Sequence, residues 1–220
     1  MTNSPNSQDR TMVKSVVFDF GGVIITPITR TIGSIAEGLG CSATDLHHIL
    51  MGPQFESGDH PWHRLERGEI EQTQLQDLLT PIAAEQGVDF RGNEIQLLLQ
   101  ENAFDINHYV LEHIGSLRER GYKTALLSNS IKEFSPMLKQ IVPPELFDVY
   151  IDSSQVGMRK PESRIFHHTL DQLGVAEASH AVFLDDFAGN LAGAQAVGMR
   201  TIHVVDPRAA LDELEALLGS

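Results

Sequence analysis

The sequence predicts an α/β fold: a Rossmann-like parallel sheet with helices on both faces and an inserted helical cap. Apolar runs at 13–18, 123–127 and 181–184 are typical of buried strands. Helical periodicity fills the intervals between later strands, and 27–119 shows helical patterns without a convincing strand. Because alternating strands and helices form parallel sheets, we expect an α/β core at 13–26 and 120–220, a cap at 27–119 and a disordered N-terminus at 1–12.

The first predicted strand runs from a β-branched pair, Val16 and Val17, into Asp19, and the glycines Gly21 and Gly22 follow. Apolar residues on both faces of this strand indicate a central position in a parallel sheet. The glycines allow a sharp turn and close approach of a ligand to the backbone. Asp19 is therefore expected at the carboxyl end of a central strand, where open α/β sheets bind ligands. The alternative is a surface turn in which Asp19 caps the next helix.

Helices are predicted in the inserted region from apolar spacing and capping signals. Gly40 is a C-cap signal and Ser42 an N-cap signal, and Trp62 is expected in the interior of the cap. The expected helices cover 31–39, 43–50, 61–68, 73–85, 91–100 and 107–120.

The second half of the chain returns to alternation. Pro161 suits the first turn of a helix, and Asp206 with Pro207 marks the start of the last one. The expected elements are a strand at 123–127, a helix at 132–140, a strand at 147–152, a helix at 161–173, a strand at 181–184, a helix at 188–197, a strand at 201–205 and a final helix from 207.

Composition restricts the partners. The net charge is −14, from 30 acidic and 16 basic side chains, which disfavours nucleic acid and anionic membranes as partners. Cys41 is the only cysteine, so no intramolecular disulfide can form. Because no apolar run approaches 18 residues, we expect a soluble, cytoplasmic protein without a membrane segment. A homodimer through the cap is left open.

Polar side chains end three of the predicted strands: Asp19, the pair Ser128 and Asn129, and the pair Asp185 and Asp186. Parallel strands bring these ends to one rim of the sheet. Lys160 lies directly before the expected helix at 161–173. Carboxylates bind Mg²⁺ through oxygen, and the remaining Mg²⁺ positions take water and phosphate oxygens. Ser128 and Asn129 can donate to phosphate, and Lys160 can neutralise a carboxylate or a phosphate.

Four stretches together resemble the haloacid-dehalogenase-like hydrolases. They are Phe18-Asp19-Phe20-Gly21-Gly22-Val23, Leu127-Ser128-Asn129, Gly157-Met158-Arg159-Lys160-Pro161 and 183–190. The chain is most similar to the phosphatase-like domain that precedes some epoxide hydrolases and acyl-CoA dehydrogenases. The resemblance covers about 13–219 and includes 61–70.

The resemblance implies a Mg²⁺-dependent phosphatase that acts on a small phosphorylated metabolite. Asp19 would be the nucleophile that forms an aspartyl-phosphate. The carbonyl of Gly21 and the carboxylates of Asp19 and Asp186 would hold Mg²⁺, with Asp185 as a direct ligand or as support for one. Ser128 and Asn129 would bind the phosphoryl group, and Lys160 would stabilise Asp19 and that group. Asn190 is assigned equally to support of this site and to helix capping.

Gly21 departs from the family pattern, which usually has a second Asp there as general acid and base. Its loss forfeits roughly 10²–10⁴-fold in rate. His60 or His63 of the cap could supply the proton instead. Gly21 also favours an alternative reading, a catalytically degenerate module that binds a ligand or a partner. A 2-haloacid dehalogenase is the remaining alternative, disfavoured because family dehalogenases usually have an aromatic residue at this position.

Overall fold

The sheet contains five parallel strands in the order β3-β2-β1-β4-β5. The computed structural model describes residues 12–27, 29–99 and 105–219, so the predicted disordered N-terminus lies outside them apart from Met12. The α/β prediction is confirmed. The strands are β1 (Ser15–Phe18), β2 (Lys123–Ser128), β3 (Val149–Asp152), β4 (Ala181–Asp185) and β5 (Arg200–His203).

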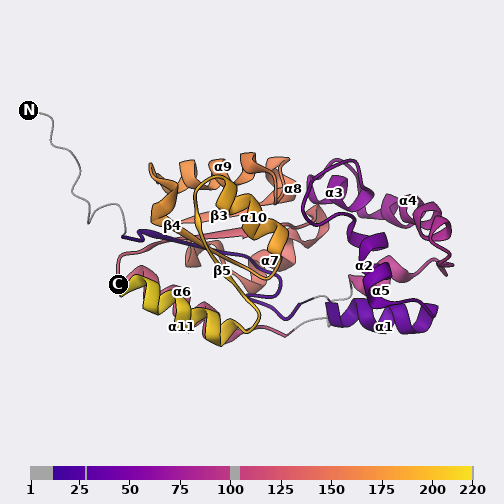
Figure 1. The fold of residues 1–220 in the computed structure, drawn as a ribbon, viewed down its shortest axis with the longest axis horizontal. Helices are drawn as coiled ribbons and strands as arrows, with labels where there is room; N and C mark the ends of the chain where they lie inside the picture. The colour runs from indigo at the N-terminus through magenta and orange to yellow at the C-terminus, as the bar shows by residue number, and fades with distance from the viewer. Residues whose placement is uncertain (1–11, 28, 100–104, 220) are drawn as a thin grey trace, which may run out of the picture.

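Alternate residues of the central strands pack on opposite faces, as the two-residue period of a strand requires. Val16 and Phe18 belong to one cluster with α6 (His108–Glu119) and α11 (Pro207–Leu218). Val17 belongs to the other, with α9 (Ser163–Leu173) and α10 (Ala188–Ala196). Figure 1 shows these two helical layers above and below the sheet. Both faces are therefore covered, which explains the apolar character of β1 and β4.

Five helices between β1 and β2 form a separate apolar cluster, which includes Leu46, Leu65, Leu75 and Leu98. We call them the inserted helices, and they lie beyond one end of the sheet (Figure 1). Among the described residues, no helix is long and apolar enough to cross a membrane. The inserted helices are α1 (Thr29–Leu39), α2 (Ala43–Met51), α3 (Pro61–Glu66), α4 (Gln72–Glu85) and α5 (Glu94–Leu98).

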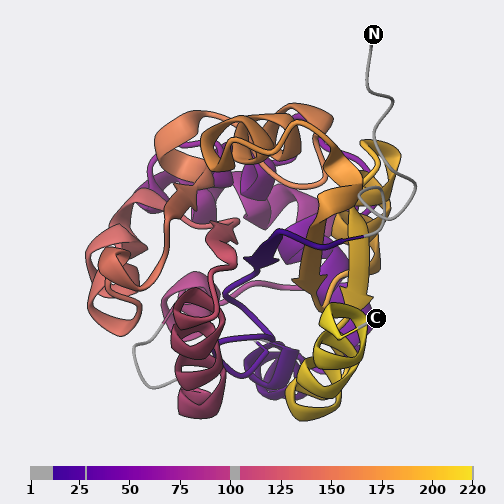
Figure 2. The same ribbon diagram turned by 90° about the vertical axis from the view of Figure 1, so that its left-hand side faces the viewer.

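Helix α6 falls within the predicted cap of 27–119 but packs on the sheet rather than on the inserted helices. Val110, Ile114 and Leu117 of α6 are fully buried in the cluster that contains the sheet. Figure 2 shows α6 beside α11 on the same face. The chain leaves and re-enters the core side by side, because the Thr26 N–H donates to the Asp105 carbonyl. The apolar spacing of α6 predicts a buried face but does not identify the surface that covers it.

Smaller differences concern element ends. Helix α9 begins at Ser163 rather than Pro161, because a turn closed by the Glu162 N–H and the Arg159 carbonyl occupies the preceding residues. Helix α5 spans only Glu94–Leu98 of the predicted 91–100, and residue 100 lies outside the described residues. After β2 the chain forms α7 (Ser135–Ile141), and β3 leads directly into α8 (Ser153–Val156).

Candidate active site

The carboxyl ends of the central strands bring the predicted polar residues to one rim. Phe18 of β1 pairs with Leu126 of β2 and with Leu184 of β4. Asp19 and Asp185 therefore follow at the same level, and the Asp19 N–H donates to the Leu184 carbonyl. One oxygen from each of Asp19, Asp185 and Asp186 lies within 4.8 Å of the others. The register of the sheet alone is enough to gather these carboxylates.

Lys160 links two of the three carboxylates. Its Nζ lies 2.6 Å from Asp19 Oδ1 and 2.7 Å from Asp185 Oδ2, and the residue is fully buried. Burial opposes its charge, but Asp185 and Asp19 outweigh this effect and raise the pKa of Lys160. Lys160 therefore stays charged and holds Asp19 in one orientation.

The site carries more negative than positive charge. Burial raises the pKa of Asp19 well above its usual value, Lys160 opposes this, and Asp185 and Asp186 add to it. Burial, followed by the charge of Asp185, raises the pKa of Asp186 to about 7. With all three carboxyl groups ionised, one ammonium would leave two negative charges uncompensated. One divalent cation would neutralise them, so the residues present fit Mg²⁺.

The two adjacent aspartates have different surroundings. Both oxygens of Asp185 accept hydrogen bonds from Asn190 Nδ2, at 3.1 and 3.0 Å. Oδ1 also accepts from the Phe187 N–H, and Oδ2 from Lys160. In contrast, Asp186 Oδ1 is buried and has no hydrogen-bond partner within the described residues. An unpaired buried carboxylate oxygen is costly unless a ligand or a cation occupies the space beside it.

Asn129 lies at the rim, and its side chain contacts the backbone of Lys160. Its Oδ1 accepts from the Lys160 N–H at 2.8 Å, and its Nδ2 donates to the Lys160 carbonyl at 3.1 Å. The amide thus clamps the backbone of Lys160. Ser128 ends β2, is buried, and lines the same cavity as Asp19.

The two glycines after Asp19 are not equivalent. Gly21 lines the cavity, and a Cβ built on it has no atom within 4 Å. Gly22 has a positive φ of 72°, and a Cβ there would lie 2.1 Å from Asp186 Oδ2. Gly22 is therefore required for the close approach of Asp186, whereas position 21 has room for a side chain.

The cavity above the rim is walled mainly by apolar side chains. It is lined by the rim residues Asp19, Gly21, Ser128, Asn129, Lys160 and Asp186. The rest comes largely from the inserted helices and the segment after β2, including Met51, Trp62, Leu98, Phe134 and Leu138. Trp62 belongs to the interior of the inserted helices, as predicted, and also lines the cavity. A ligand bound to the rim would thus place its remaining atoms against an apolar wall.

Neither His60 nor His63 is among the described residues that line this cavity. Burial, with a contribution from Arg159, lowers the pKa of His63 to about 3. Burial also lowers the pKa of His60. His60 Nδ1 accepts from the Trp62 N–H, and His63 Nδ1 accepts from the Gly58 N–H. Both contacts organise the turn into α3, and the structure gives no support to the predicted rescue by either histidine.

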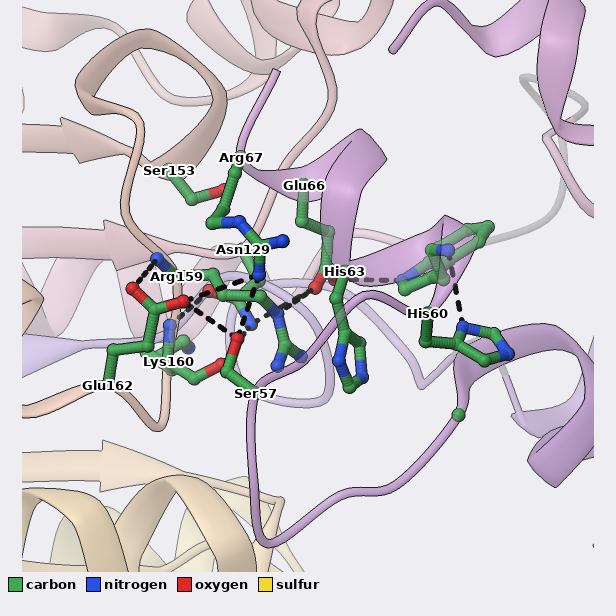
Figure 3. A network of polar contacts seen from close by, with 12 residues as sticks. Ser57, His60, His63, Glu66, Arg67, Asn129, Ser153, Arg159, Lys160 and Glu162 are labelled. Atoms are coloured by element: carbon green, nitrogen blue, oxygen red, sulfur yellow. Dashed lines mark hydrogen bonds and ion pairs between the residues drawn. The ribbon is translucent and has the colours of Figure 1, made fainter. Parts of the chain in front are cut away.

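Sequence reasoning missed a buried ion pair at the edge of the cavity. Glu66 Oε2 on α3 accepts from Arg159 Nε at 2.6 Å, and Glu66 Oε1 accepts from Trp62 Nε1 at 2.9 Å (Figure 3). Arg159 directly precedes Lys160, so this pair ties α3 to the loop that carries the lysine. Glu66 lies within 61–70, which is part of the resemblance. Nothing else in the sequence pointed to Glu66, and the resemblance implied no role for it.

The raised pKa of Asp186 leads to a prediction on stability. A carboxyl whose pKa is higher in the folded state binds protons more tightly there, so its contribution to stability is lost as pH rises from about 4 through about 7. Mg²⁺ should reverse this loss. At 100 times its Kd, a ligand adds about 2.7 kcal/mol, or roughly 5–10 °C in Tm for a chain of this size.

Thermal melts with EDTA or Mg²⁺ test this expectation at pH 5 and pH 8. The Mg²⁺-dependent rise in Tm should be larger at pH 8, because protons compete for the same oxygens at pH 5. Asp186→Asn is the control and should remove both the metal response and this part of the pH dependence. Equal rises at both pH values would contradict the expectation.

Comparison with known proteins agrees with this geometry. The chain is 32% identical over 209 residues to mouse acyl-CoA dehydrogenase family member 10, and 31% identical over 222 residues to rat bifunctional epoxide hydrolase 2. Each alignment covers 94% of this chain but only 19% and 39% of those proteins. It is also 28% identical to the sesquiterpene phosphatase astK of Aspergillus oryzae, over 95% of this chain and 98% of that protein.

Solved structures show the same fold. A HAD-like family hydrolase from Porphyromonas gingivalis matches with a TM-score of 0.69 at 23% identity, over 95% of this chain and 99% of that one. A HAD family enzyme from Bacteroides thetaiotaomicron, in complex with magnesium and inorganic phosphate, matches with a TM-score of 0.59 at 22% identity, over 87% and 93%. The sequence model of the haloacid dehalogenase-like hydrolases matches residues 13–198. The resemblance is thereby confirmed, and the chain belongs to the haloacid dehalogenase-like hydrolase family.

Proposed function

We propose that this protein is a Mg²⁺-dependent phosphatase that acts on a small phosphate monoester with an apolar alcohol part. The observation that carries the proposal is the buried Lys160–Asp19 contact of 2.6 Å, together with Asp186 Oδ1, which has no hydrogen-bond partner among the described residues. The first supplies an oriented nucleophile and the second an oxygen for a hard cation. The name of the Aspergillus relative, a sesquiterpene phosphatase, agrees with this substrate class.

Asp19 attacks phosphorus as the P–O bond to the alcohol breaks, which forms an aspartyl-phosphate. Water then attacks the same phosphorus, and the bond to Asp19 breaks to release phosphate. Lys160 orients the Asp19 carboxylate and offsets its charge, while the Ser128 hydroxyl and the Asn129 N–H donate to phosphoryl oxygens. The departing alkoxide takes its proton from solvent, and the attacking water releases one to solvent, because position 21 is glycine and supplies no acid or base. Poor leaving groups should therefore react slowly.

Asp19, Asp186 and the carbonyl of Gly21 would hold the metal, and Asp185 would position these groups without binding it directly. Both oxygens of Asp185 already accept hydrogen bonds, which supports this division. Bound there, Mg²⁺ supplies positive charge to the transferring phosphoryl group. The inserted helices act as a cap over the phosphoryl group, since they supply much of the cavity wall.

The apolar wall makes the rate depend on the length of the alcohol. Each methylene buried on binding contributes about 0.8 kcal/mol, or roughly fourfold in kcat/KM. We expect release of phosphate from linear alkyl phosphates to rise by about this factor per carbon until the cavity is filled. Glycerol and sugar phosphates should react more slowly than alkyl phosphates of similar size.

Phe134→Ser tests the contribution of the wall, with Phe55→Ser as its control. Phe134 lines the cavity, whereas Phe55, on the loop before α3, is 72% exposed and does not line it. The first variant should flatten the dependence on chain length, and the second should leave it unchanged. A polar substrate preferred over every alkyl phosphate would overturn the substrate class.

A binding module without turnover is the second candidate function. The observation in its favour is that Asp19, Asp186 and Glu66 are the only carboxyl groups of the described residues that line the cavity. Glu66 is already bonded to Trp62 and Arg159. Absence of phosphate release from aryl, acyl and alkyl phosphates, together with Mg²⁺-dependent binding of alkyl phosphonates, would favour this candidate.

A further inference from the structure

Arg159 is a buried arginine whose hydrogen bonds are incomplete. The residue is 4% exposed, and within the described residues its Nε is the only side-chain nitrogen that donates a hydrogen bond, to Glu66. Its Nη1 is buried and has no partner there. A guanidinium carries five N–H donors. Leaving buried donors unpaired is costly, so native structures rarely do so without a reason.

Arg67, shown in the same view, provides the comparison (Figure 3). It is 8% exposed, and all three of its nitrogens donate: Nε to Glu69, Nη1 to Ser57 Oγ and Nη2 to the Gly58 carbonyl. The fold is thus able to satisfy a buried arginine in this region. The open donor on Arg159 needs its own explanation.

The neighbouring histidine cannot accept from Arg159. The charge of Arg159 contributes to the lowered pKa of His63, which places the two groups near one another. His63 Nδ1 already accepts from the Gly58 N–H, so Nε2 carries the hydrogen and is a second donor. Among the described residues no acceptor bonds Nη1, and Nη2 donates no hydrogen bond either, so the guanidinium keeps open donors.

Arg159 lines the same cavity as Asp19 and Lys160, next to Trp62 and Glu66. A donor in a mainly apolar wall selects a ligand oxygen that would otherwise be buried without a partner. The positive charge of Arg159 is already balanced by Glu66 at 2.6 Å. A second anion would approach Glu66 as well, so a neutral oxygen fits this position better than a carboxylate.

We propose that Arg159 is a substrate-binding residue, whose guanidinium donates to a neutral oxygen on the alcohol part of the phosphate monoester. The oxygen is that of a hydroxyl, ether or carbonyl group in an otherwise apolar chain. The proposal rests on the function proposed above and adds one specificity-determining contact to it. Lys160 contacts the phosphoryl group, and Arg159 contacts the alcohol part of the substrate.

The test compares alkyl phosphonates with isosteres in which an oxygen replaces one methylene at successive positions. Phosphonates are not hydrolysed, so calorimetric binding with Mg²⁺ does not depend on turnover. We expect one oxygen position to bind about 10- to 100-fold more tightly in wild type than in Arg159→Lys. The lysine keeps a cation for Glu66 but lacks the Nη donors. The plain phosphonate is the reference compound, and the preference in each protein is the affinity of each isostere relative to it.

Phosphate release from the matching phosphates provides the second readout. The proposal would be overturned if wild type and Arg159→Lys preferred the oxygen equally. It would also be overturned if Arg159→Lys lost activity on all compounds to the same extent, because such a loss indicates phosphoryl binding or a structural role. Preference for a carboxylate would contradict the assigned class. If the variant does not fold, the series of isosteres is measured on wild type alone. If no oxygen position is favoured there, the proposed contact does not exist. Binding preference without phosphate release would overturn the phosphatase and leave this inference intact.

Discussion

Asp19→Asn is expected to lower phosphate release by about 10⁴-fold or more, to the background rate. The amide retains the shape of Asp19 but cannot attack phosphorus, and loss of a nucleophile generally removes most of an enzyme's rate acceleration. Phosphate release with Mg²⁺, from the alkyl phosphate that wild type prefers, measures the effect. Intact-mass spectra should also show an added phosphoryl group on wild type, after brief exposure to an aryl phosphate, and none on the variant.

The fold should survive this change. The pKa of Asp19 is raised by burial, so removing its charge relieves an unfavourable state, and Lys160 retains Asp185 as a partner at 2.7 Å. Asp148→Asn is the matched control, since Asp148 precedes β3 at the opposite end of the sheet and contacts Lys123. It should have wild-type activity. Turnover by Asp19→Asn at the rate of this control would exclude Asp19 as the nucleophile.

The sequence was sufficient to predict the position of a residue that directly follows or ends a strand. Asp19 and Asp185 come together because parallel strands in register share an edge. The two-faced burial of β1 likewise follows from a continuous apolar run. Helix α6 shows where this reasoning fails. Its apolar spacing predicts a buried face, but the covering surface is set by where the chain re-enters the sheet.

The pairings across the cavity could not be predicted, because each joins residues far apart in the chain. Glu66 and Arg159 are separated by 93 positions, and the Asn129 amide clamps a backbone 31 positions away. No local pattern records such contacts. The surroundings of His60 and His63 could not be predicted for the same reason. Their environment, which leaves them neutral and outside the cavity wall, depends on the packing of α2 against α3.

Gly21→Asp is expected to raise turnover of alkyl phosphates by roughly 10²–10⁴-fold, the usual contribution of a general acid and base. The site can accept the side chain, since Gly21 lines the cavity and its Cβ would have no neighbour within 4 Å. Aryl phosphates should gain much less, because their leaving groups depart without a proton. Initial rates on a matched alkyl and aryl pair measure this difference.

Two variants separate proton transfer from other effects of the new side chain. Gly21→Asn has the same shape without the acid and should give no gain on alkyl phosphates. Gly22→Ala should lose activity, because its Cβ would lie 2.1 Å from Asp186 Oδ2 and displace that carboxylate. A gain by Gly21→Asp alone means that the machinery of Asp19, Lys160 and Asp186 is complete apart from one proton donor. No gain by Gly21→Asp, with Mg²⁺ binding intact, means that another step limits the rate and that glycine at position 21 is not the deficit.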